Sequence, residues 1–576
     1  MTLVLDLPGP DGAAPRVLAQ LVSAALYEGL LAVEAEGAAG PDGRRTVRLG
    51  AAGLVIDAEL YTGAFGRPRV VPGTVRLNGL PAPADAAASI IAALVPEPVR
   101  RTRLQDEFAR TASGLAHAIR VAPANRRELD FARLDSAIYE GHPYHPAFRG
   151  RLGFNDADDM RFGPEAKAGF QLRWLLVRDD RLHRSGPDLR GPDGWAQLAG
   201  PVVAAMALDR VGAEAAAQWQ LMPVHPWQWR AKTSAIVAPA IALGEVHDLG
   251  VAGESYRATQ SLRTLINLDR PDAPHLKLPL AVVNTSVART LDPHWALAGP
   301  AISDWLATLV ANDRWLSDGD RLAVLKETRA LVFDRNGTEA EHTGAIWRDN
   351  PAARLAPGEE AVPLNALFAV EADGDPFVAP WIRRYGCAGF VTQLIEVVVR
   401  PLVHLLLAYG LASEAHGQNL VLIHRDGWPV RIALRDFSDN LEWVPDFLRG
   451  APPLPDFTAI DPLFADRTPN RFYWMQDVEE LRWLFTDAVL IFSLADFAFL
   501  MERRYGHTQK AFFDQILCLV TNHAKALKLE HRADQLGLHA PTVVTDRLLS
   551  AKLGHAAEGP LVVPNSLARK PWKALA

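Results

Sequence analysis

The hydrophobic pattern along the chain alternates between helical and strand-like stretches, which indicates a mixed α+β protein. Residues 16–36 place apolar side chains at helical spacing, whereas residues 45–80 alternate apolar and polar positions between Gly, Pro and Asn residues. These patterns are typical of an amphipathic helix and of a small antiparallel sheet. Helical spacing returns over residues 86–140. We therefore expect an N-terminal α+β unit over residues 1–140, with no obvious catalytic constellation.

Strand patterns recur in the middle of the chain. SLRTLINL (261–268) and HLKLPLAVV (275–283) are apolar runs separated by a turn, so we expect one hairpin there that continues into NTSVART (284–290). Alternate residues of a strand share a face, which would place Ser261 and Arg263 side by side. A second strand pair is expected over residues 328–348.

Helical patterns dominate the C-terminal part. Long apolar helices are predicted over residues 389–412 and 475–535. Between them, two apolar runs flank Asp426-Gly427, which is the strongest short signal for a hairpin.

Length and composition indicate a soluble protein with more than one domain. At 576 residues the chain exceeds what one hydrophobic core covers, so two or three domains are expected. It is 49% hydrophobic and 22% charged, as soluble globular proteins are. The formal charge of -7 and the absence of a long Lys/Arg run argue against a nucleic acid or a membrane surface as partner.

Cysteine usage and targeting signals favour the cytoplasm. Cys387 and Cys518 are the only cysteines, which argues against a disulfide framework and against structural zinc. The N-terminal residues lack the basic and apolar segments of a signal peptide. The most apolar stretches, residues 391–411 and 488–501, contain charged residues and are not convincing membrane spans.

A dense polar motif, GHPYHPAFRGRLGF, occupies residues 141–154. Each proline removes a backbone donor and biases the residue before it toward extended geometry, so His142 and His145 lie in a rigid loop. Arg149 and Arg151 follow closely. Imidazole donors and guanidinium groups in one loop suit a phosphate or a carboxylate. The alternative is a proline-rich loop whose histidines bond to the backbone.

The segment 261–290 combines cations with hydroxyl groups in otherwise apolar strands. This combination favours an anion site over solvated edge charges. The residues concerned are Ser261, Arg263, Thr264, Lys277, Thr285, Ser286 and Arg289. No GxxxxGK[ST] or GxGxxG motif is present, so we expect side chains rather than a glycine-rich loop to bind phosphates.

A third polar cluster follows the helix predicted over residues 389–412. Its members are Glu414, His416, Gln418 and Asn419. The hairpin after it would return Asp436 to the side of Asn419, and a carboxylate with an amide oxygen suits a Mg²⁺ ion that also keeps waters and phosphate oxygens. Alternatively, Asn419 and Asp436 cap the hairpin and His416 is a hydrogen-bonded buried histidine.

In this order, the three motifs resemble the NRPS-independent siderophore synthetases of the IucA/IucC type. The matching pieces are GHPYHPAFRGRLGF, SLRT with HLKLPLAVVNTSVART, and EAHGQNLVLI with RDF. One departure is Arg149, where the family commonly has Lys. The positive charge is kept, but a planar guanidinium replaces the compact ammonium group and changes the contact geometry. The resemblance implies a hand-like α+β architecture with a thumb (1–140), a β-rich fingers domain (141–300) and a largely helical palm (301–576).

The resemblance also implies a reaction. A carboxylate, typically citrate, would attack the α-phosphate of MgATP, and an amine, hydroxylamine or alcohol would then displace AMP. Such a ligase needs fixed cations where negative charge develops and no covalent enzyme intermediate. A homodimer is expected by resemblance, whereas the particular acid and nucleophile are left open.

The family's site residues map onto the motifs. For the phosphates, the resemblance implies His145, Arg149, Ser261, Arg263, Thr264 and Lys277. For Mg²⁺, it implies Glu414, Asn419 and Asp436. For the carboxylate substrate, it implies Thr285, Ser286, Arg289, His416 and Gln418. The residues expected to be catalytic are His145, Arg263, Lys277, Arg289 and His416.

Two other functions fit parts of the pattern. HGQN, the hairpin and RDF also resemble the catalytic segment of kinases related to aminoglycoside phosphotransferases, but Gln418 stands at the position of the kinase base and Asn419 is adjacent rather than five residues on. A non-catalytic citrate- or siderophore-binding protein would need the anion cluster without the Mg²⁺ site. The basic tail could bring Arg547 or Lys552 to a cleft, although surface solvation is the expected role of each.

Overall fold

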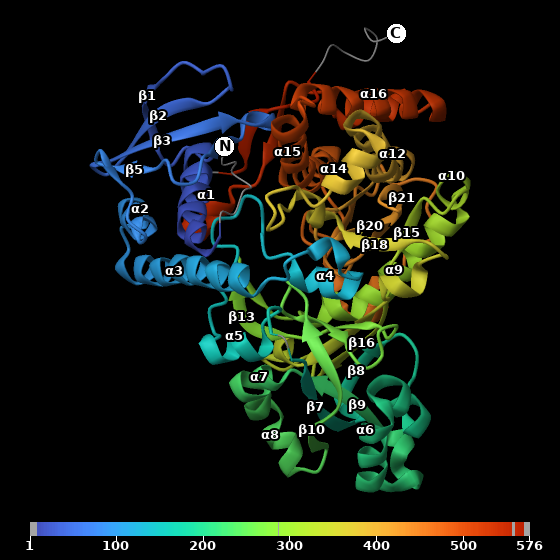
Figure 1. The fold of residues 1–576 in the computed structure, drawn as a ribbon. Coiled ribbons are helices and arrows are strands. Elements are labelled where there is room, and N and C mark those ends of the chain that lie inside the picture. The colour runs from blue at the N-terminus through green and yellow to red at the C-terminus, as the bar shows by residue number, and fades with distance from the viewer. Residues whose placement is uncertain (1–8, 167, 286, 556–558, 569–576) are drawn as a thin grey trace.

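The structure, a computed structural model, describes residues 9–166, 168–285, 287–555 and 559–568. Figure 1 shows a blue N-terminal unit beside the helices of the C-terminal part, with a green central sheet below both. The arrangement confirms the mixed α+β class with a β-rich centre and a largely helical C-terminal part.

The N-terminal unit pairs one helix with a six-stranded antiparallel sheet. Helix α1 (Ala13–Tyr27) contacts β4, and the strand order is β1-β2-β3-β5-β6 with β4 on β3. The strands are β1 (Ala32–Glu36), β2 (Arg45–Ala51), β3 (Leu54–Thr62), β4 (Pro68–Val70), β5 (Arg76–Leu77) and β6 (Leu80–Pro81). The helix predicted over 16–36 is wrong at its end. Gly29 adopts a φ of 75° just after the helix, and β1 pairs with β2 instead.

The helices predicted over residues 86–140 are confirmed. They are α2 (Ala86–Leu94), α3 (Pro98–Val121) and α4 (Phe131–Ala137). The Glu97 side chain caps α3 by accepting from the backbone N–H groups of Val99 and Arg100, which satisfies two donors that the first turn leaves free.

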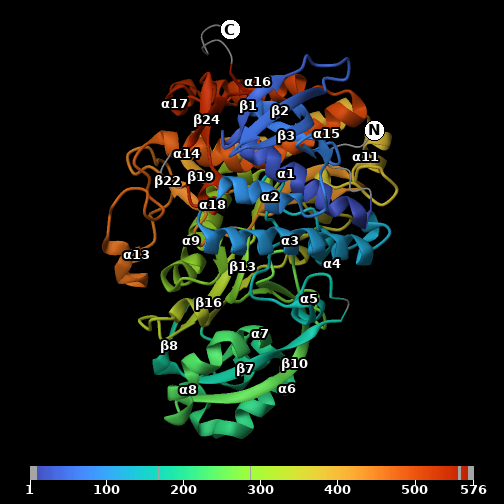
Figure 2. The same cartoon turned by 90° about the vertical axis from the view of Figure 1, so that its left-hand side faces the viewer.

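An eight-stranded sheet forms the centre, in the order β8-β16-β17-β12-β11-β10-β7-β9. The strands are β7 (Phe170–Arg178), β8 (Leu182–Ser185), β9 (Trp219–Val224), β10 (Val246–Ala258), β11 (Thr264–Asn267), β12 (His275–Lys277), β16 (Glu327–Phe333) and β17 (Gly344–Arg348). Figure 2 shows the long β7 and β10 pair at its lower end. The predicted strand pair over 328–348 is confirmed as β16 and β17, which join this sheet from beyond residue 300. The division into three domains stays a prediction.

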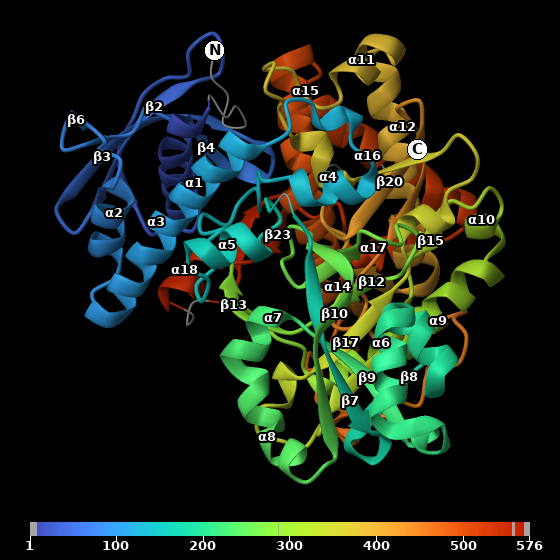
Figure 3. The same cartoon turned by 60° about the horizontal axis from the view of Figure 1, so that its bottom comes forward.

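Helices cover the central sheet. Helix α6 (Gly191–Ala215) contacts β10 and β9, and α9 (Pro293–Asn312) contacts β16 and β8. Figure 3 shows α6 and α8 on either side of the β7–β10 pair. The shorter helices of this part are α5 (Asp156–Phe162), α7 (Pro226–Gln228), α8 (Ser234–Ala242) and α10 (Arg314–Ser317).

The hairpin predicted over 261–290 is confirmed in that β11 pairs antiparallel with β12, but the prediction is wrong in two respects. Strand β11 begins only at Thr264, because Leu262 adopts a φ of 66° and turns the chain. Ser261 and Arg263 therefore lie in a turn rather than on one face of a strand. Secondly, β13 (Leu280–Asn284) and β14 (Val287–Arg289) form a separate two-stranded sheet, after β12 ends before Pro279.

The C-terminal hairpin matches its prediction. Asp426 and Gly427 adopt φ values of 51° and 84°, as a tight hairpin turn requires. The backbone N–H of Arg435 donates to the Asn419 carbonyl at 3.1 Å, which confirms that RDF returns to HGQN. The four-stranded sheet around it consists of β15 (Leu322–Val324), β21 (Trp428–Leu434), β20 (Leu420–Arg425) and β18 (Glu360–Pro363).

Two apolar helical segments form the C-terminal core. Cys387–Tyr409 and Val478–Tyr505 are long and apolar enough to cross a membrane, but 78% and 94% of their apolar windows are buried inside the protein. The first consists of α12 (Cys387–His404) and a π-helical turn, and the second of α14 (Val478–Phe485), the π-helical segment η12 (Thr486–Leu494) and α15 (Ala495–Tyr505). The other elements are α11 (Ala379–Tyr385), α13 (Phe457–Ile460), α16 (Gln509–Leu527), α17 (Glu530–Leu536), α18 (Leu548–Leu553), β19 (Leu411–Ser413), β22 (Leu441–Trp443), β23 (Thr542–Thr545) and β24 (Leu561–Pro564).

The N-terminal and C-terminal units share one hydrophobic core, which runs from α1 to Leu567. A buried ion pair crosses the same contact, where Arg67 and Arg69 both bond the Asp496 carboxylate. Close packing of the units, expected from the absence of a low-complexity linker, is therefore confirmed.

Candidate active site

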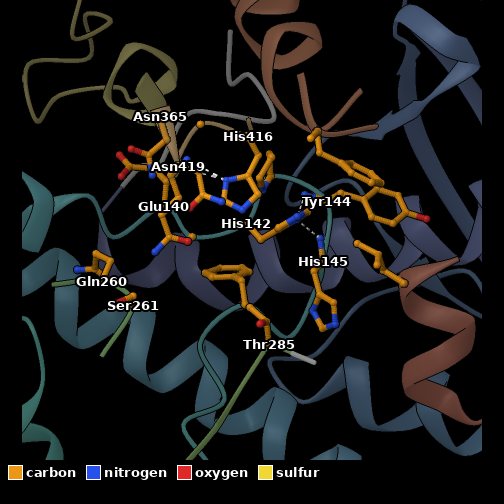
Figure 4. Close-up of a pocket in the computed structure, with 18 of the residues that line it drawn as sticks. Glu140, His142, Tyr144, His145, Gln260, Ser261, Thr285, Asn365, His416 and Asn419 are labelled. Carbon is orange, nitrogen blue, oxygen red and sulfur yellow. Dashed lines mark hydrogen bonds between the residues drawn. The ribbon is translucent and has the colours of Figure 1, made fainter. Parts of the chain in front are cut away.

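One cavity of about 430 Å³ gathers most of the predicted site residues. In Figure 4, His142, His145 and His416 lie near one another at this cavity. The predicted residues that line it are His145, Arg149, Ser261, Arg263, Thr264, Thr285, Arg289, Glu414, His416, Gln418, Asn419 and Asp436. Lys277 does not line the cavity but bonds Asp436, which does, and Ser286 lies outside the described residues.

The two histidines of the His-Pro loop present Nε2 as a donor. His142 Nδ1 accepts from the backbone N–H of Tyr144 and of His145, and His145 Nδ1 accepts from that of Ala147 at 3.2 Å. An accepting Nδ1 leaves the proton of a neutral imidazole on Nε2. Burial, and then the charge of His142, lowers the pKa of His145 well below its ordinary value, so the ring is neutral. Its Nε2 is buried and has no hydrogen-bond partner among the described residues, which suits donation to an anionic oxygen.

Arg149 and Arg151 share one carboxylate, Glu165. Arg149 bonds one oxygen of Glu165, and Arg151 Nη1 lies 2.9 Å from the other. Burial opposes ionisation of Glu165, but the two guanidinium groups outweigh it and hold the pKa of Glu165 below its ordinary value. Arg149 therefore reaches the cavity with its charge already matched.

The turn before β11 is fixed by its own hydrogen bonds. Ser261 Oγ lies 3.0 Å from Thr259 Oγ1 and accepts from the backbone N–H of Thr264 at 3.2 Å. Arg263 donates to the Thr290 carbonyl, which ties the turn to the end of β14. Donors held in this way need little reorganisation when negative charge develops beside them.

The β13–β14 turn carries Thr285 and Arg289. Arg289 Nη2 donates to Thr285 Oγ1 at 2.7 Å, and Thr285 adopts a left-handed φ of 58°. Burial, and then Arg263, lowers the pKa of Arg289 to about 10. Lys552 donates to the Thr285 carbonyl at 2.5 Å and pairs with Glu107. The surface role expected for Lys552 is therefore wrong, because its side chain is only 8% exposed and pairs with Glu107 of α3.

The HGQN segment fixes the tautomer of His416 in the same way as the His-Pro loop fixes those of its histidines. His416 Nδ1 accepts from the backbone N–H of Gln418 at 3.2 Å and of Asn419 at 3.3 Å, so Nε2 is again the donor. Burial lowers the pKa of His416 to about 4. Arg435 holds this segment by donating to the Gln418 carbonyl at 2.8 Å, and Asp135 bonds both of its Nη atoms.

Asp436 lies between two cations. It accepts from Lys277, and its other oxygen lies 4.0 Å from Arg348 Nη1. Burial opposes its ionisation, but Lys277, Arg348 and Arg263 hold the pKa of Asp436 below its ordinary value. Lys277 also lies 4.0 Å from Glu327, whose pKa burial raises to about 7. The phosphate cation and the metal ligand implied by the resemblance thus bond each other.

The pKa of Glu414 is shifted in the opposite direction from that of Asp436. Burial, and then the charges of Asp439 and Asp436, raises the pKa of Glu414 to about 8. Its side chain is 39% exposed, and Glu414 lines the cavity.

Glu414, Asn419 and Asp436 offer hard oxygen donors around one space. Among the described residues, no group of three His, Cys, Asp or Glu side chains is arranged to hold a metal by itself. Two carboxylates and an amide would suit a Mg²⁺ ion, which keeps several waters or phosphate oxygens as ligands.

Sequence reasoning missed several residues of the cavity wall, because they belong to no recognised motif. They are Arg16, Arg67, Arg348, Asn365, Asp439, Asp487 and Asp546. Arg16 and Asp487 each interrupt an apolar helical pattern, and a buried charge in such a helix is the signal that could have identified them.

The comparisons with known proteins agree with this site. The IucA / IucC family model matches residues 130–369. The chain is 33% identical over 456 residues to the citryl-spermidine/3,4-dihydroxybenzoyl-citryl-spermidine:spermidine ligase of Bacillus anthracis, covering 76% of this chain and 73% of that protein. The chain therefore belongs to the IucA / IucC family of siderophore synthetases, which are ligases.

Solved structures share the fold. Petrobactin biosynthesis protein AsbB from Bacillus anthracis str. Sterne superposes with a TM-score of 0.88 at 28% identity, covering 99% of this chain and 98% of that one. ATP-bound aerobactin synthetase IucA from a hypervirulent pathotype of Klebsiella pneumoniae gives a TM-score of 0.77 at 18% identity, covering 97% and 100%, and shows the fold alone.

A second family model, the ferric iron reductase FhuF-like transporter, matches residues 389–561. This match covers most of the helical C-terminal part of the chain.

Proposed function

We propose that this chain is an ATP-dependent ligase that activates a carboxylic acid, with citrate as the expected acid, and joins it to an amine, hydroxylamine or alcohol. The observation that carries the proposal is the pair of neutral imidazoles, His145 and His416, whose Nε2 donors line one cavity with the fixed cations Arg263 and Arg289. The printed name of the Bacillus anthracis relative, a citryl-spermidine ligase, supports an acid and an amine as the substrates.

In this reaction a carboxylate oxygen attacks the α-phosphorus of ATP and pyrophosphate leaves. The nucleophile then attacks the acyl carbon, the bond to AMP breaks, and the nucleophile loses one proton to solvent. Mg²⁺, when bound, would neutralise phosphate charge, and Glu414, Asn419 and Asp436 would hold it.

The side chains of this protein would position the substrates and stabilise the negative charge that develops on the phosphates. His145, Ser261, Arg263 and Thr264 would donate to phosphate oxygens, where charge builds as pyrophosphate leaves. Lys277 would join them from its pair with Asp436. Arg149 would contribute less, because Glu165 already matches its charge.

The carboxylic acid substrate is assigned to the β13–β14 turn and to the HGQN segment. Thr285, Arg289, His416 and Gln418 would hold its carboxylates, together with Ser286. Holding acid and phosphate in line supplies a large share of such catalysis.

Neither alternative function gains support. The family membership favours a ligase over a phosphotransferase, and the Mg²⁺-type donor set exceeds what a binding protein needs. A thumb–fingers–palm division, a homodimer and a cytoplasmic location remain predictions.

Product analysis tests the proposal directly. The protein is incubated with ATP, Mg²⁺, a panel of acids that includes citrate, and hydroxylamine as a surrogate nucleophile. AMP and pyrophosphate formed only with an acid support the ligase. ADP formation, or AMP formation without any acid, contradicts it.

A further inference from the structure

Helix α1 carries one stripe of side chains with polar atoms in an otherwise apolar sequence. The other residues of the helix are Ala, Val, Leu and one Pro. The members of the stripe recur at every third or fourth residue, so they share one face of the helix. They are Arg16, Gln20, Ser23 and Tyr27, of which the first three line the cavity. A helix of the N-terminal unit, where the sequence indicated no catalytic constellation, therefore reaches the site.

Gln20 ties the His-Pro loop at two points. Its amide Nε2 donates to the His142 carbonyl at 2.8 Å and to the His145 carbonyl at 3.0 Å. An amide nitrogen carries two protons, so one side chain can serve both carbonyls. The side chain is only 9% exposed, and the bond to His145 is fully buried. Gln20 thus bonds the two residues that precede the prolines of the loop.

The loop depends on such side-chain donors. Pro143 and Pro146 have no backbone N–H, so this segment has fewer donors of its own with which to hold its carbonyl groups. Two arginines of the N-terminal unit supply more. Arg16 Nη2 donates to the Glu140 carbonyl at 2.6 Å, and Arg67 donates to the Pro143 carbonyl. The backbone of the His-Pro loop is therefore held from the N-terminal unit.

The bond from Gln20 bears directly on the direction of the His145 ring. The His145 carbonyl accepts from Gln20, and His145 Nδ1 accepts from the backbone N–H of Ala147 at 3.2 Å. These two bonds hold the residue on both sides and leave the buried Nε2 without a hydrogen-bond partner among the described residues. A rotation of the His145 backbone would move Nε2 and disturb the bond at Nδ1. A donor stabilises developing charge well only when it is already held in place.

We propose that Gln20 is a positioning residue, which fixes the backbone of the His-Pro loop so that His145 Nε2 donates to the phosphates of ATP. Gln20 itself acts through the histidine and contacts its backbone rather than a reacting atom. The inference rests on the proposed ligase function for the role of the phosphates, whereas the hold on the His145 ring is a property of the protein alone.

A double-variant cycle tests whether Gln20 acts through His145. Gln20→Met keeps a side chain of similar length and removes both donors. It is expected to lower the rate of acid-dependent AMP formation about tenfold. In the His145→Ala background the same substitution should change the rate by less than about twofold, because the group that Gln20 holds is already absent. Equal factors in both backgrounds, or no effect of Gln20→Met on the wild type, would overturn the proposal.

NMR of the protein without ATP gives a second, independent readout. The protein is labelled with ¹⁵N at its histidine rings, and the signals of His145 are identified by their loss in His145→Ala. A ring held in one neutral tautomer shows one protonated and one unprotonated nitrogen. In Gln20→Met the two His145 signals should move toward each other, because both tautomers become populated. Signals that stay at their wild-type positions would show that Gln20 does not hold the ring.

A matched control separates positioning from a general loss of a buried hydrogen bond. Gln105 lies in α3 of the same unit, and its Nε2 donates to the Ala88 carbonyl at 2.9 Å outside the cavity. Gln105→Met should keep both the rate and the His145 signals of the wild type. A loss of rate in Gln105→Met as large as that in Gln20→Met would contradict the assigned role.

Gln20→Glu tests the same claim if Gln20→Met fails to fold. A carboxylate at this position faces two carbonyl oxygens and cannot donate, whereas the protonated acid donates to one of them. Burial raises the pKa of such a group, so the rate of the variant relative to wild type should rise as the pH falls from about 8 to about 6. A ratio that does not change with pH would overturn the proposal.

The outcomes distinguish the two claims. Acid-dependent AMP formation by the wild type reports the ligase alone, and its absence would overturn the proposed function. The NMR comparison needs no substrate, so it decides whether Gln20 holds the His145 ring in either case.

Discussion

The two sides of the cavity are built on opposite principles. On the cationic side, formed by His145, Arg263, Lys277 and Arg289, the cations bond a carbonyl, a hydroxyl or a carboxylate of the protein, and the histidine is fixed in one tautomer. A second set of lining carboxylates, Asp439, Asp487 and Asp546, which we call the acidic wall, forms no ion pair with a described Lys or Arg side chain. The cationic side is therefore organised before any ligand arrives, whereas the acidic wall has no fixed cationic partner.

The contrast matches the two steps of the proposed reaction. Stabilising charge in a transition state requires groups that do not reorganise, so firm partners favour catalysis. Selecting a second substrate instead requires an interaction that only the correct ligand completes. The predictions that follow test this division, beginning with the variant expected to lose most activity.

Asp436→Asn should have the largest effect. It removes the carboxylate that bonds Lys277, so both a metal ligand and the position of a phosphate cation are disturbed. Acid-dependent AMP formation should fall about 100-fold to 1,000-fold. Asp426→Asn is the control, because it makes the same substitution at the exposed turn of the same hairpin, where Asn tolerates a φ of 51°. Equal activities of the two variants would remove Asp436 from the site.

His145→Ala should lower the rate of AMP formation about 100-fold, because the cavity loses a neutral donor. His145→Gln keeps an N–H donor and should recover part of the loss. His225→Gln is the matched control: His225 also precedes a proline and accepts through Nδ1, but it does not line the cavity. A loss in His225→Gln as large as that in His145→Ala would show that folding, rather than donation, explains the effect.

Lys552→Met should raise the KM for the acid about fivefold, because the Thr285 carbonyl loses its donor. It should also lower stability by about 3 kcal/mol, because the buried carboxyl group of Glu107 is left without its cation. The double variant with Glu107→Gln should recover the thermal stability, measured by Tm, but not the KM. Recovery of both values would reduce Lys552 to a partner of Glu107.

The smallest effect concerns stability against pH and differs in sign between the two sides. The pKa of Asp487, raised to about 7 in the fold, means that its contribution is present at low pH and is lost as the pH rises to about 7. Asp487→Asn lacks this loss, so its Tm relative to wild type should increase by roughly 1 °C or more between about pH 5 and about pH 8. A Tm difference that does not change with pH would contradict the raised pKa.

For His416, the pH dependence of stability has the opposite sign. The pKa of His416, lowered to about 4 by burial, means that its contribution is present at neutral pH and is lost as the pH falls from its ordinary value toward 4. His416→Gln should therefore change the acid limb of the Tm profile and leave the limb above about pH 7 unchanged. One series of Tm measurements against pH therefore distinguishes the cationic side of the cavity from the acidic wall.

The same division explains what the sequence could predict. The cationic side is coded by short motifs, in which neighbouring residues such as His142 and His145 or Gln418 and Asn419 share one loop, and all but one of its described members line the cavity as expected. The hairpin at Asp426-Gly427 was predictable because its turn requires left-handed residues. These are local constraints, and local constraints are visible in one sequence.

The acidic wall could not be predicted, because its three members are brought together only by tertiary packing. Asp487 lies in an apolar helix, Asp546 follows a short strand, and neither is near Asp439 in the sequence. The turn at Ser261 was missed for a related reason: a left-handed Leu262 has no sequence signal, since such a φ is rare for a branched apolar residue. Lys552 was mistaken for a surface residue because its partner Glu107 lies far away in the chain.

The exchange of pyrophosphate into ATP, measured without any amine, tests the central claim most directly. If the cationic side activates the acid before the nucleophile binds, exchange should require citrate or another acid, should fall in Asp436→Asn and should persist in Asp487→Asn. Exchange that needs no acid, or an acid-dependent release of ADP instead, would contradict the account.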